Sequence, residues 1–163
     1  VAGLTANAYL FVRLFKPNNK DLIKSISKNF IGVTLLALLF CITGTILGGI
    51  WGDESWGRFW GWDPKENGAL LLCLWLLIVL HGKWGKQLKE LGVATMLALT
   101  NIAVLLAWFG VNLLSVGLHS YGFTEGAAFY LLIACSAILV LTALPAFIIY
   151  IRDATQVKAP QQP

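Results

Sequence analysis

Long uncharged apolar runs, separated by short polar segments, dominate the pattern of this sequence. We expect membrane-spanning helices over residues 30–50, 64–84, 91–114 and 126–151. Helices of about 20 residues can cross a hydrocarbon core of roughly 30 Å. Residues 1–15 are interpreted as the last turns of a further, partial span. The sequence therefore predicts an all-α fold, a polytopic transmembrane helix bundle that forms one domain over 1–163 and ends in a disorder-like tail at 157–163.

The composition agrees with residence in a membrane. Of the 163 residues, 58% are hydrophobic and 12% are charged, which excludes an ordinary soluble domain. The net charge of +4 is explained by membrane orientation and by contact with membrane lipid. We therefore expect no nucleic-acid partner.

Lysine and arginine are concentrated on one side of the predicted bundle. The ten that lie there are Arg13, Lys16, Lys20, Lys24, Lys28, Lys83, Lys86, Lys89, Arg152 and Lys158. Only Arg58 and Lys65 lie on the other side. The positive-inside rule places the larger group in the cytoplasm or its organellar equivalent, as in a multi-pass protein of a bacterial inner membrane or a thylakoid-like membrane. The opposite loops then face the periplasm or its equivalent.

The segment 19–30 predicts an interfacial helix before the first full span. Its lysines recur every four residues, at Lys20, Lys24 and Lys28, and its apolar residues fall on another helical face. The alternative is a solvated basic loop.

Tryptophan is concentrated at residues 51–66, which read WGDESWGRFWGWDPKE. Four of the seven tryptophans lie there: Trp51, Trp56, Trp60 and Trp62. We interpret the segment as an outer-face loop whose indole rings receive a flat ligand. Its last residues, Asp63 to Glu66, also fit a helix capping box with Pro64 in the first turn. Asp63 and Glu66 therefore need no catalytic role.

The chain has two histidines, and they differ in their predicted positions. His119 follows the third full span, so counting crossings places it on the same face as the tryptophans. There it is a candidate axial ligand for haem iron, with Arg58 and Lys65 near enough to meet the propionates. His81 lies about 26 Å along its predicted helix at 1.5 Å per residue. It either faces the bundle interior with a function or lies in the interfacial aromatic belt beside Trp84.

Other chemistries find little support in the sequence. Cys41, Cys73 and Cys135 each lie inside an apolar span without a C-x-x-C pair, and are interpreted as packing residues. Two histidines without a nearby Cys/His/Asp set do not build a zinc site. No nucleotide-binding or nucleophile motif occurs in context.

Three motifs in a fixed order carry a resemblance to a known family. They are WGDESWGRFWGWDPKE, a helix that ends in LHGK, and WFGVNLLSVGLHSYG. Together they cover residues 48–123 and resemble the CcsA/ResC membrane proteins of cytochrome c maturation, which handle haem through a "WWD" domain. The resemblance implies a component that binds haem b on its outer-face tryptophan-rich loop and presents it for covalent attachment to an apocytochrome c with a C-x-x-C-H motif.

The resemblance also implies site residues and partners. His119 matches an external haem ligand, His81 matches a transmembrane haem ligand, and the four loop tryptophans and Asp63 match the haem-holding loop. A CcsB/ResB-type membrane protein is the implied partner. The complex of the two acts as a cytochrome c haem lyase, which leaves open whether this chain is itself an enzyme.

One departure from the family pattern leaves alternatives open, because no histidine precedes the tryptophan-rich loop here. The upstream ligands either lie on a further N-terminal portion or on another chain, or this is a reduced relative that does not bind haem in that way. The competing interpretation is a non-catalytic scaffold or accessory membrane subunit of a larger respiratory or photosynthetic complex.

Overall fold

The computed structural model describes residues 1–120 and 125–158, and these form helices and connecting turns without strands. The elements are α1 (Ala2–Phe15), α2 (Lys20–Lys28), α3 (Phe30–Trp56), α4 (Pro64–Trp84), α5 (Glu90–Trp108), the 3-10 helix η1 (Gly110–Leu114) and α6 (Ala127–Lys158). The predicted all-α bundle is confirmed. The disorder-like tail predicted at 157–163 is wrong for residues 157 and 158, which belong to the last turn of α6; the rest of it, 159–163, lies outside the described residues.

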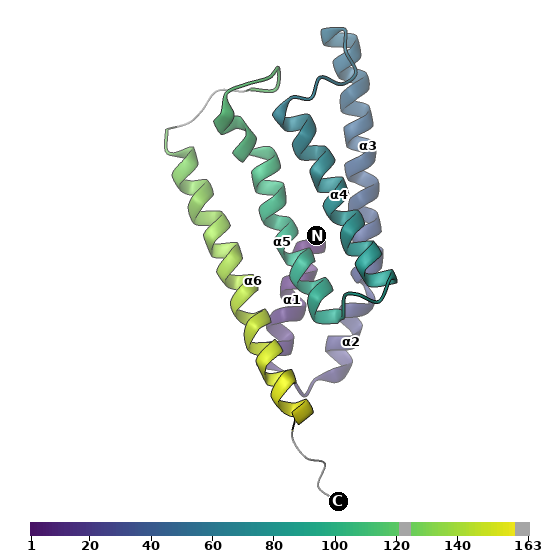
Figure 1. Cartoon of the computed structure of the whole chain (residues 1–163), viewed down its shortest axis with the longest axis vertical. Helices are drawn as coiled ribbons and strands as arrows, with labels where there is room; N and C mark the ends of the chain where they lie inside the picture. Colours follow the sequence, from purple (N-terminus) through teal and green to yellow (C-terminus); the bar gives the residue numbers. More distant parts are fainter. Residues whose placement is uncertain (121–124, 159–163) are drawn as a thin grey trace, which may run out of the picture.

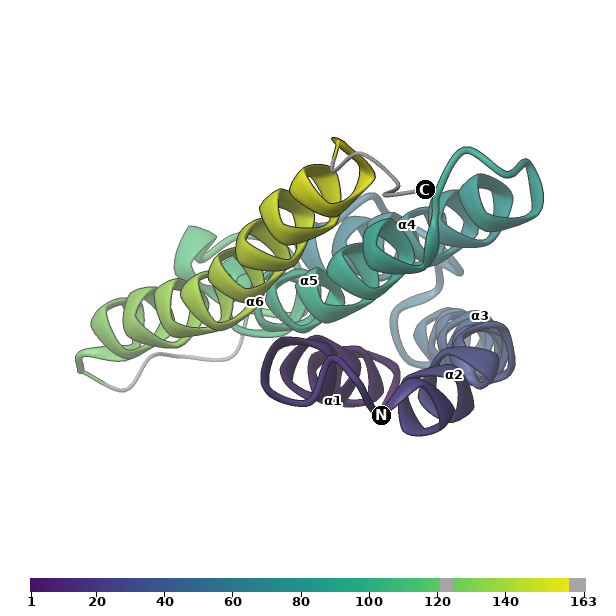
Figure 2. The same cartoon turned by 90° about the horizontal axis from the view of Figure 1, so that it is seen from below.

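Four helical segments of the described chain are long and apolar enough to cross a membrane. They are Lys20–Trp56, Pro64–Trp84, Glu90–Leu114 and Ala127–Gln156, in agreement with the four predicted full spans. The helices α3, α4, α5 and α6 run side by side along the long axis, and α1 lies against their lower part (Figure 1). Figure 2 shows α1 beneath α5, beside the pair formed by α2 and α3.

The bundle has two chemically different ends. The end at the top of Figure 1 holds the last turns of α3, the start of α4, η1 and the start of α6, and we call it the tryptophan end. The opposite end holds α2, the α4–α5 turn and the end of α6, and we call it the basic end. The lysines and arginines predicted to share one side belong to the elements of the basic end. Which compartment each end faces stays a prediction.

Small residues bring α1 close to α5 in the centre of the bundle. Ala6, Ala94 and Ala98 are completely buried. A Cβ added at Gly3 would meet the Asn101 side chain at 2.3 Å, so the two helices approach more closely than a larger residue would allow. In the absence of a hydrophobic driving force between helices in lipid, such close packing is a main source of association.

The segment predicted as interfacial is helical, so the alternative of a solvated loop is wrong. Asn19 caps α2 through Oδ1, which accepts a hydrogen bond from the Leu22 backbone at 3.1 Å. None of its residues is buried, and Ile23 and Ile26 pack against the core. The chain turns at Asn29 directly into α3. Whether α2 lies in a membrane interface stays a prediction.

The first full span extends further than expected. We expected it to end at Ile50, but α3 continues to Trp56 and stops where Gly57 adopts the left-handed conformation, at φ 70°. Nothing between these positions breaks a helix, which explains the extension. Trp51 and Trp56 therefore lie on the last turns of α3, and the connecting loop is the short segment 57–63.

Candidate functional site

Three segments meet at the tryptophan end to form the candidate site. They are the last turns of α3 with the loop that follows, the first turn of α4, and the segment after η1 that carries His119. The predicted proximity of His119 to the tryptophans is therefore seen in the structure, since the Trp56 and His119 rings lie 4.8 Å apart between centroids.

Asp63 caps α4 as the sequence predicts. Its Oδ1 accepts hydrogen bonds from the backbone N–H groups of Lys65 at 3.0 Å and Glu66 at 3.1 Å. In return, Glu66 Oε2 accepts from the backbone N–H of Asp63 at 3.2 Å and of Gly61 at 2.7 Å. The capping box is confirmed, and it also fixes the loop that leads into the helix.

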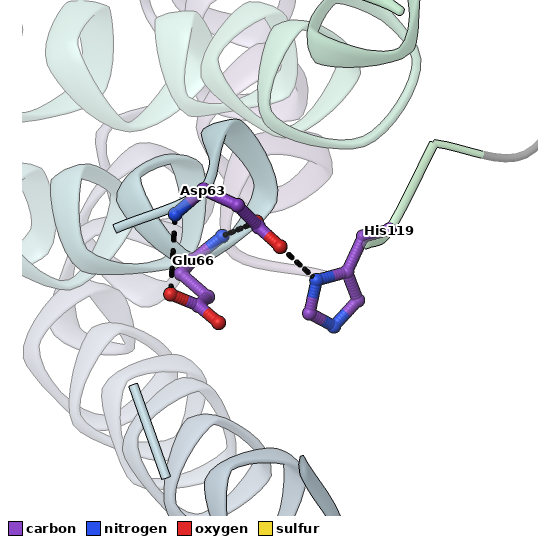
Figure 3. Close-up of side chains that lie close together, drawn as sticks. All are labelled: Asp63, Glu66 and His119. Atoms are coloured by element: carbon purple, nitrogen blue, oxygen red, sulfur yellow. Dashed lines mark hydrogen bonds and ion pairs between the residues drawn. The ribbon is translucent and has the colours of Figure 1, made fainter. Parts of the chain in front are cut away.

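The same carboxylate holds His119. Asp63 Oδ2 is hydrogen-bonded to His119 Nδ1, as Figure 3 shows. Burial acts to raise the pKa of the Asp63 carboxyl, but hydrogen bonds from His119 and from the Glu66 and Lys65 backbones outweigh it, so the pKa lies below its usual value. The carboxylate is therefore ionised at neutral pH and can only accept, so Nδ1 carries the proton. Nε2, which Figure 3 shows on the far side of the ring from Asp63, is left to meet a ligand.

A glycine allows this contact. Gly117 lies two residues before His119 with φ 87°, in the region that favours glycine. A Cβ added there would come within 2.7 Å of the Asp63 side chain. Gly117 thus brings the His119 segment directly against the start of α4.

The tryptophan rings do not form one flat surface. Trp51 and Trp56 meet edge to face, with centroids 4.9 Å apart and planes at 80°. Trp60 and Trp62 form a second such pair, at 5.8 Å and 87°. Trp51 and Trp62 are the outer members and are 54% and 68% exposed. The two inner members, Trp56 and Trp60, line the cavity described next.

A cavity of about 590 Å³ lies beneath the tryptophan pairs, between α3 and α4. Its upper wall carries the rings of Trp56, Phe59, Trp60, Trp108 and His119, together with Lys65 and Glu66. It then runs down α3 past Gly52, Gly49, Gly48 and Gly44 to Cys41 and Phe40. Its volume is typical of a site for one small molecule or cofactor, and its charged groups and its histidine are all at the upper end, with the Thr45 hydroxyl further down.

Gly44 and Gly48 leave the backbone of α3 open to a ligand, whereas Gly49 lies against the Phe59 ring and Gly52 against the Arg58 carbonyl. A Cβ added at Gly44 or Gly48 would meet no atom within 4 Å. Every fourth residue from Gly44 to Gly52 is glycine, which on a helix places all of them on one face. A flat apolar ligand could lie along the open part of this face, with its polar groups near His119 and Lys65.

The structure separates the remaining predicted residues from this cavity. Arg58 folds back so that its Nη1 reaches the Gly61 carbonyl at 3.5 Å. His81 lies near the basic end of α4, where its side chain is exposed and its ring lies 6.4 Å from that of Trp84. Of its two interpretations, the exposed position beside Trp84 agrees with the interfacial one.

Asp63, Glu66 and His119 also offer a possible metal-ion geometry. One ligand atom from each lies within 4.8 Å of the others. Both Asp63 oxygens and Glu66 Oε2 already accept the hydrogen bonds of the capping box and of His119. His119 Nε2 takes part in none of these bonds and can therefore be offered to a metal centre.

Comparison with known proteins decides the family. The family described as "Cytochrome C assembly protein" matches residues 1–119 of the chain. The chain belongs to this family. The predicted resemblance to CcsA-type proteins is thereby confirmed, and the family and the four apolar helices together show an integral multi-pass membrane protein.

Among curated members of the family, several plant proteins called "Cytochrome c biogenesis protein CcsA" are similar to this chain. The protein of Helianthus annuus is 39% identical over 90 residues, which are 55% of this chain and 28% of that protein. The protein of Populus alba is 32% identical over 118 residues, 69% of this chain and 37% of that protein. The chain thus matches about a third of the length of these relatives. No solved structure matches it.

Sequence reasoning missed Phe59, Trp108 and the glycine face of α3. The four-residue repeat of Gly44, Gly48 and Gly52 was the available signal, because it predicts an open stripe on one helical face. Phe59 and Trp108 had no such signal, since aromatic residues are common at membrane boundaries.

Proposed function

We propose that this protein binds haem in the cavity at the tryptophan end and presents it for covalent attachment to apocytochrome c. The observation that supports this most strongly is the arrangement of His119. Its Nδ1–H is held by a buried carboxylate, and the ring borders an aromatic, glycine-faced cavity. Histidines that ligate metals commonly donate their second N–H to a carboxylate in this way, which fixes the ring and raises its basicity.

The rest of the cavity suits the other parts of haem. The rings of Trp56, Trp60 and Trp108 offer apolar contact to the porphyrin, and the α3 glycines allow its face to approach the helix backbone. Lys65 lines the same cavity and can meet a propionate, as expected from the sequence. Haem is here the cargo, and its iron protoporphyrin form, haem b, is the proposed species.

One axial position of the iron is left for another ligand. The chain contains only two histidines, and His81 lies on the far part of α4. We propose that the second ligand comes from residues beyond this sequence, on a further N-terminal portion or on another chain, and that a CcsB/ResB-type membrane protein is the partner. An iron held on one side by His119 could then be offered to the C-x-x-C-H motif of the apocytochrome.

The charges at the two ends support an orientation. The basic end carries most of the lysines and arginines, so the positive-inside rule favours a location in the cytoplasm or its organellar equivalent. The tryptophan end then faces the periplasm or its equivalent, where an apocytochrome can approach the cavity.

The test is a titration of the purified protein with ferric haem, in which tryptophan fluorescence is monitored. Because three tryptophans line the cavity, we expect saturable quenching at one haem per chain. Protoporphyrin IX without iron serves as the control, and it should bind about tenfold more weakly, or worse, because it cannot accept the bond from His119.

Equal affinity for the two porphyrins would contradict the proposed ligand. Haem binding without quenching would contradict the proposed cavity. Failure to bind haem at all would favour the alternative of a scaffold subunit, for which co-purification with a larger complex at fixed stoichiometry is the signature.

A further inference from the structure

A second cavity, of about 1650 Å³, lies at the basic end between α1, α2, α5 and α6. We call it the basic-end cavity. Its lining includes five cationic side chains, Arg13, Lys20, Lys24, Lys89 and Arg152, and two carboxylates, Glu90 and Asp153. The charge inside it is therefore positive.

Both carboxylates are already paired. Asp153 Oδ2 lies 2.5 Å from Arg13 Nη2, and Glu90 forms an ion pair with Lys83. Arg152 is also engaged, since its Nη2 donates to the Arg13 carbonyl at 2.9 Å. The two Arg13 contacts join α1 to α6 and the Lys83 ion pair joins α4 to α5, and both ion pairs neutralise acidic groups that would repel an anion.

Three lysines of the cavity remain without an ion pair among the described residues. Lys20 and Lys24 lie one turn apart on α2, and Lys89 lies across the cavity at the start of α5. Three ammonium groups around one space, unmatched by carboxylates, favour an anion with several oxygens, such as a phosphate.

The opposite wall of the cavity is apolar and faces outward. Phe147 and Tyr150 of α6 line it and are 63% and 62% exposed. They continue the exposed apolar surface of a helix long enough to span the membrane, so this side of the cavity borders hydrocarbon. A free phosphate or an acidic soluble peptide would leave that wall unused, whereas a phospholipid would cover it with an acyl chain.

A buried carboxylate oxygen in the cavity wall also favours an occupant that carries a hydroxyl group. Glu90 Oε2 is buried and accepts no hydrogen bond from the residues that the structure describes. An unsatisfied buried acceptor is costly, and because the Glu90 side chain as a whole is 44% exposed, a rotation that brings Oε2 to a hydroxyl donor of an occupant would remove the cost. The glycerol head group of phosphatidylglycerol carries both the phosphate and such hydroxyls.

We propose that the basic-end cavity binds an anionic glycerophospholipid, with its phosphate among Lys20, Lys24 and Lys89 and an acyl chain along Phe147 and Tyr150. Basic pockets between membrane helices are suited to anionic head groups. Because α2 supplies two of the lysines and packs on α1 and α3, the lipid would fasten this short helix to the bundle.

The experiment measures binding of phosphatidylglycerol and phosphatidylcholine to the purified protein in neutral detergent, by native mass spectrometry. We expect phosphatidylglycerol to bind at least about tenfold more tightly. The triple substitution Lys20→Gln, Lys24→Gln, Lys89→Gln should remove most of this preference. The matched control, Lys16→Gln, Lys28→Gln, Lys86→Gln, removes the same charge from the same end but from outside the cavity lining, and should keep the preference.

Three results would overturn the proposal: equal binding of the two lipids by the wild-type protein, an equal loss in both triple variants, or displacement of phosphatidylglycerol by inorganic phosphate at the same concentration. The last would assign the site to a free phosphate. Because the substituted lysines of both variants are exposed, the fold should survive, and helical circular dichroism checks this. If the cavity variant does not fold, labelling of α6 by a photoreactive phosphatidylglycerol on the wild-type protein decides instead, and absence of a label near Tyr150 contradicts the proposal.

Discussion

His119→Ala is expected to weaken ferric haem binding by about 100-fold or more, because it removes the proposed bond from Nε2 to iron. The cavity itself should persist. The Asp63 cap bonds to the backbone of α4 do not involve the histidine, so the helix start remains formed. The measurement is a haem titration followed by the absorption spectrum, in which the ligand field of the bound imidazole is lost.

Three further measurements test whether the loss of affinity comes from the missing imidazole. Added imidazole should restore the spectrum of His119→Ala, because it can occupy the space of the missing ring. Asp63→Asn should weaken binding about 10- to 100-fold, the usual range for the partner of a metal-binding histidine. His81→Ala should bind haem in this cavity as the wild type does. A His119→Ala protein with wild-type affinity would refute the ligand assignment.

Gly48→Leu is expected to abolish most haem binding while leaving the fold intact. The new side chain would project into the cavity from the open face of α3, where an added Cβ meets no atom within 4 Å. It should clash with the porphyrin and not with the protein. Replacing glycine by leucine within a helix also favours the helix by about 0.5–1 kcal/mol. The unfolding temperature should therefore rise while the affinity for haem falls.

Gly32→Leu is the matched control. Gly32 lies on the same helix, is exposed, has no atom within 4 Å of an added Cβ and does not line the cavity. It should gain the same helix stability and bind haem normally. If Gly32→Leu and Gly48→Leu lost haem equally, the glycine face of α3 would not be the porphyrin site.

Much of the fold follows from apolar length and helix signals alone. The four spans, the α2 helix and the capping box at Asp63 were all predicted, because each depends on local sequence. The end of α3 was not, since the change from apolar to polar residues at Ile50 does not stop a helix. The left-handed Gly57 stops it, and that required the backbone conformation.

The candidate site was predictable only where it depends on local sequence and on the order of the spans. Counting crossings placed His119 with the tryptophans, but its pairing with Asp63 joins residues far apart in sequence and depends on the close approach at Gly117. The capping box accounted for Asp63 from local sequence alone, so its second contact, the hydrogen bond with His119, was not expected. Likewise the edge-to-face packing of the tryptophans depends on tertiary contacts that their spacing does not encode.

Pulsed electron paramagnetic resonance on a chain with one histidine shows whether His119 ligates haem iron. In a tag-free chain of residues 1–163, His81→Ala leaves His119 as the only imidazole. With ¹⁵N-labelled histidine and natural-abundance ferric haem, we expect a ¹⁵N hyperfine coupling from one axial imidazole. A spectrum of bound haem with no ¹⁵N coupling would contradict it.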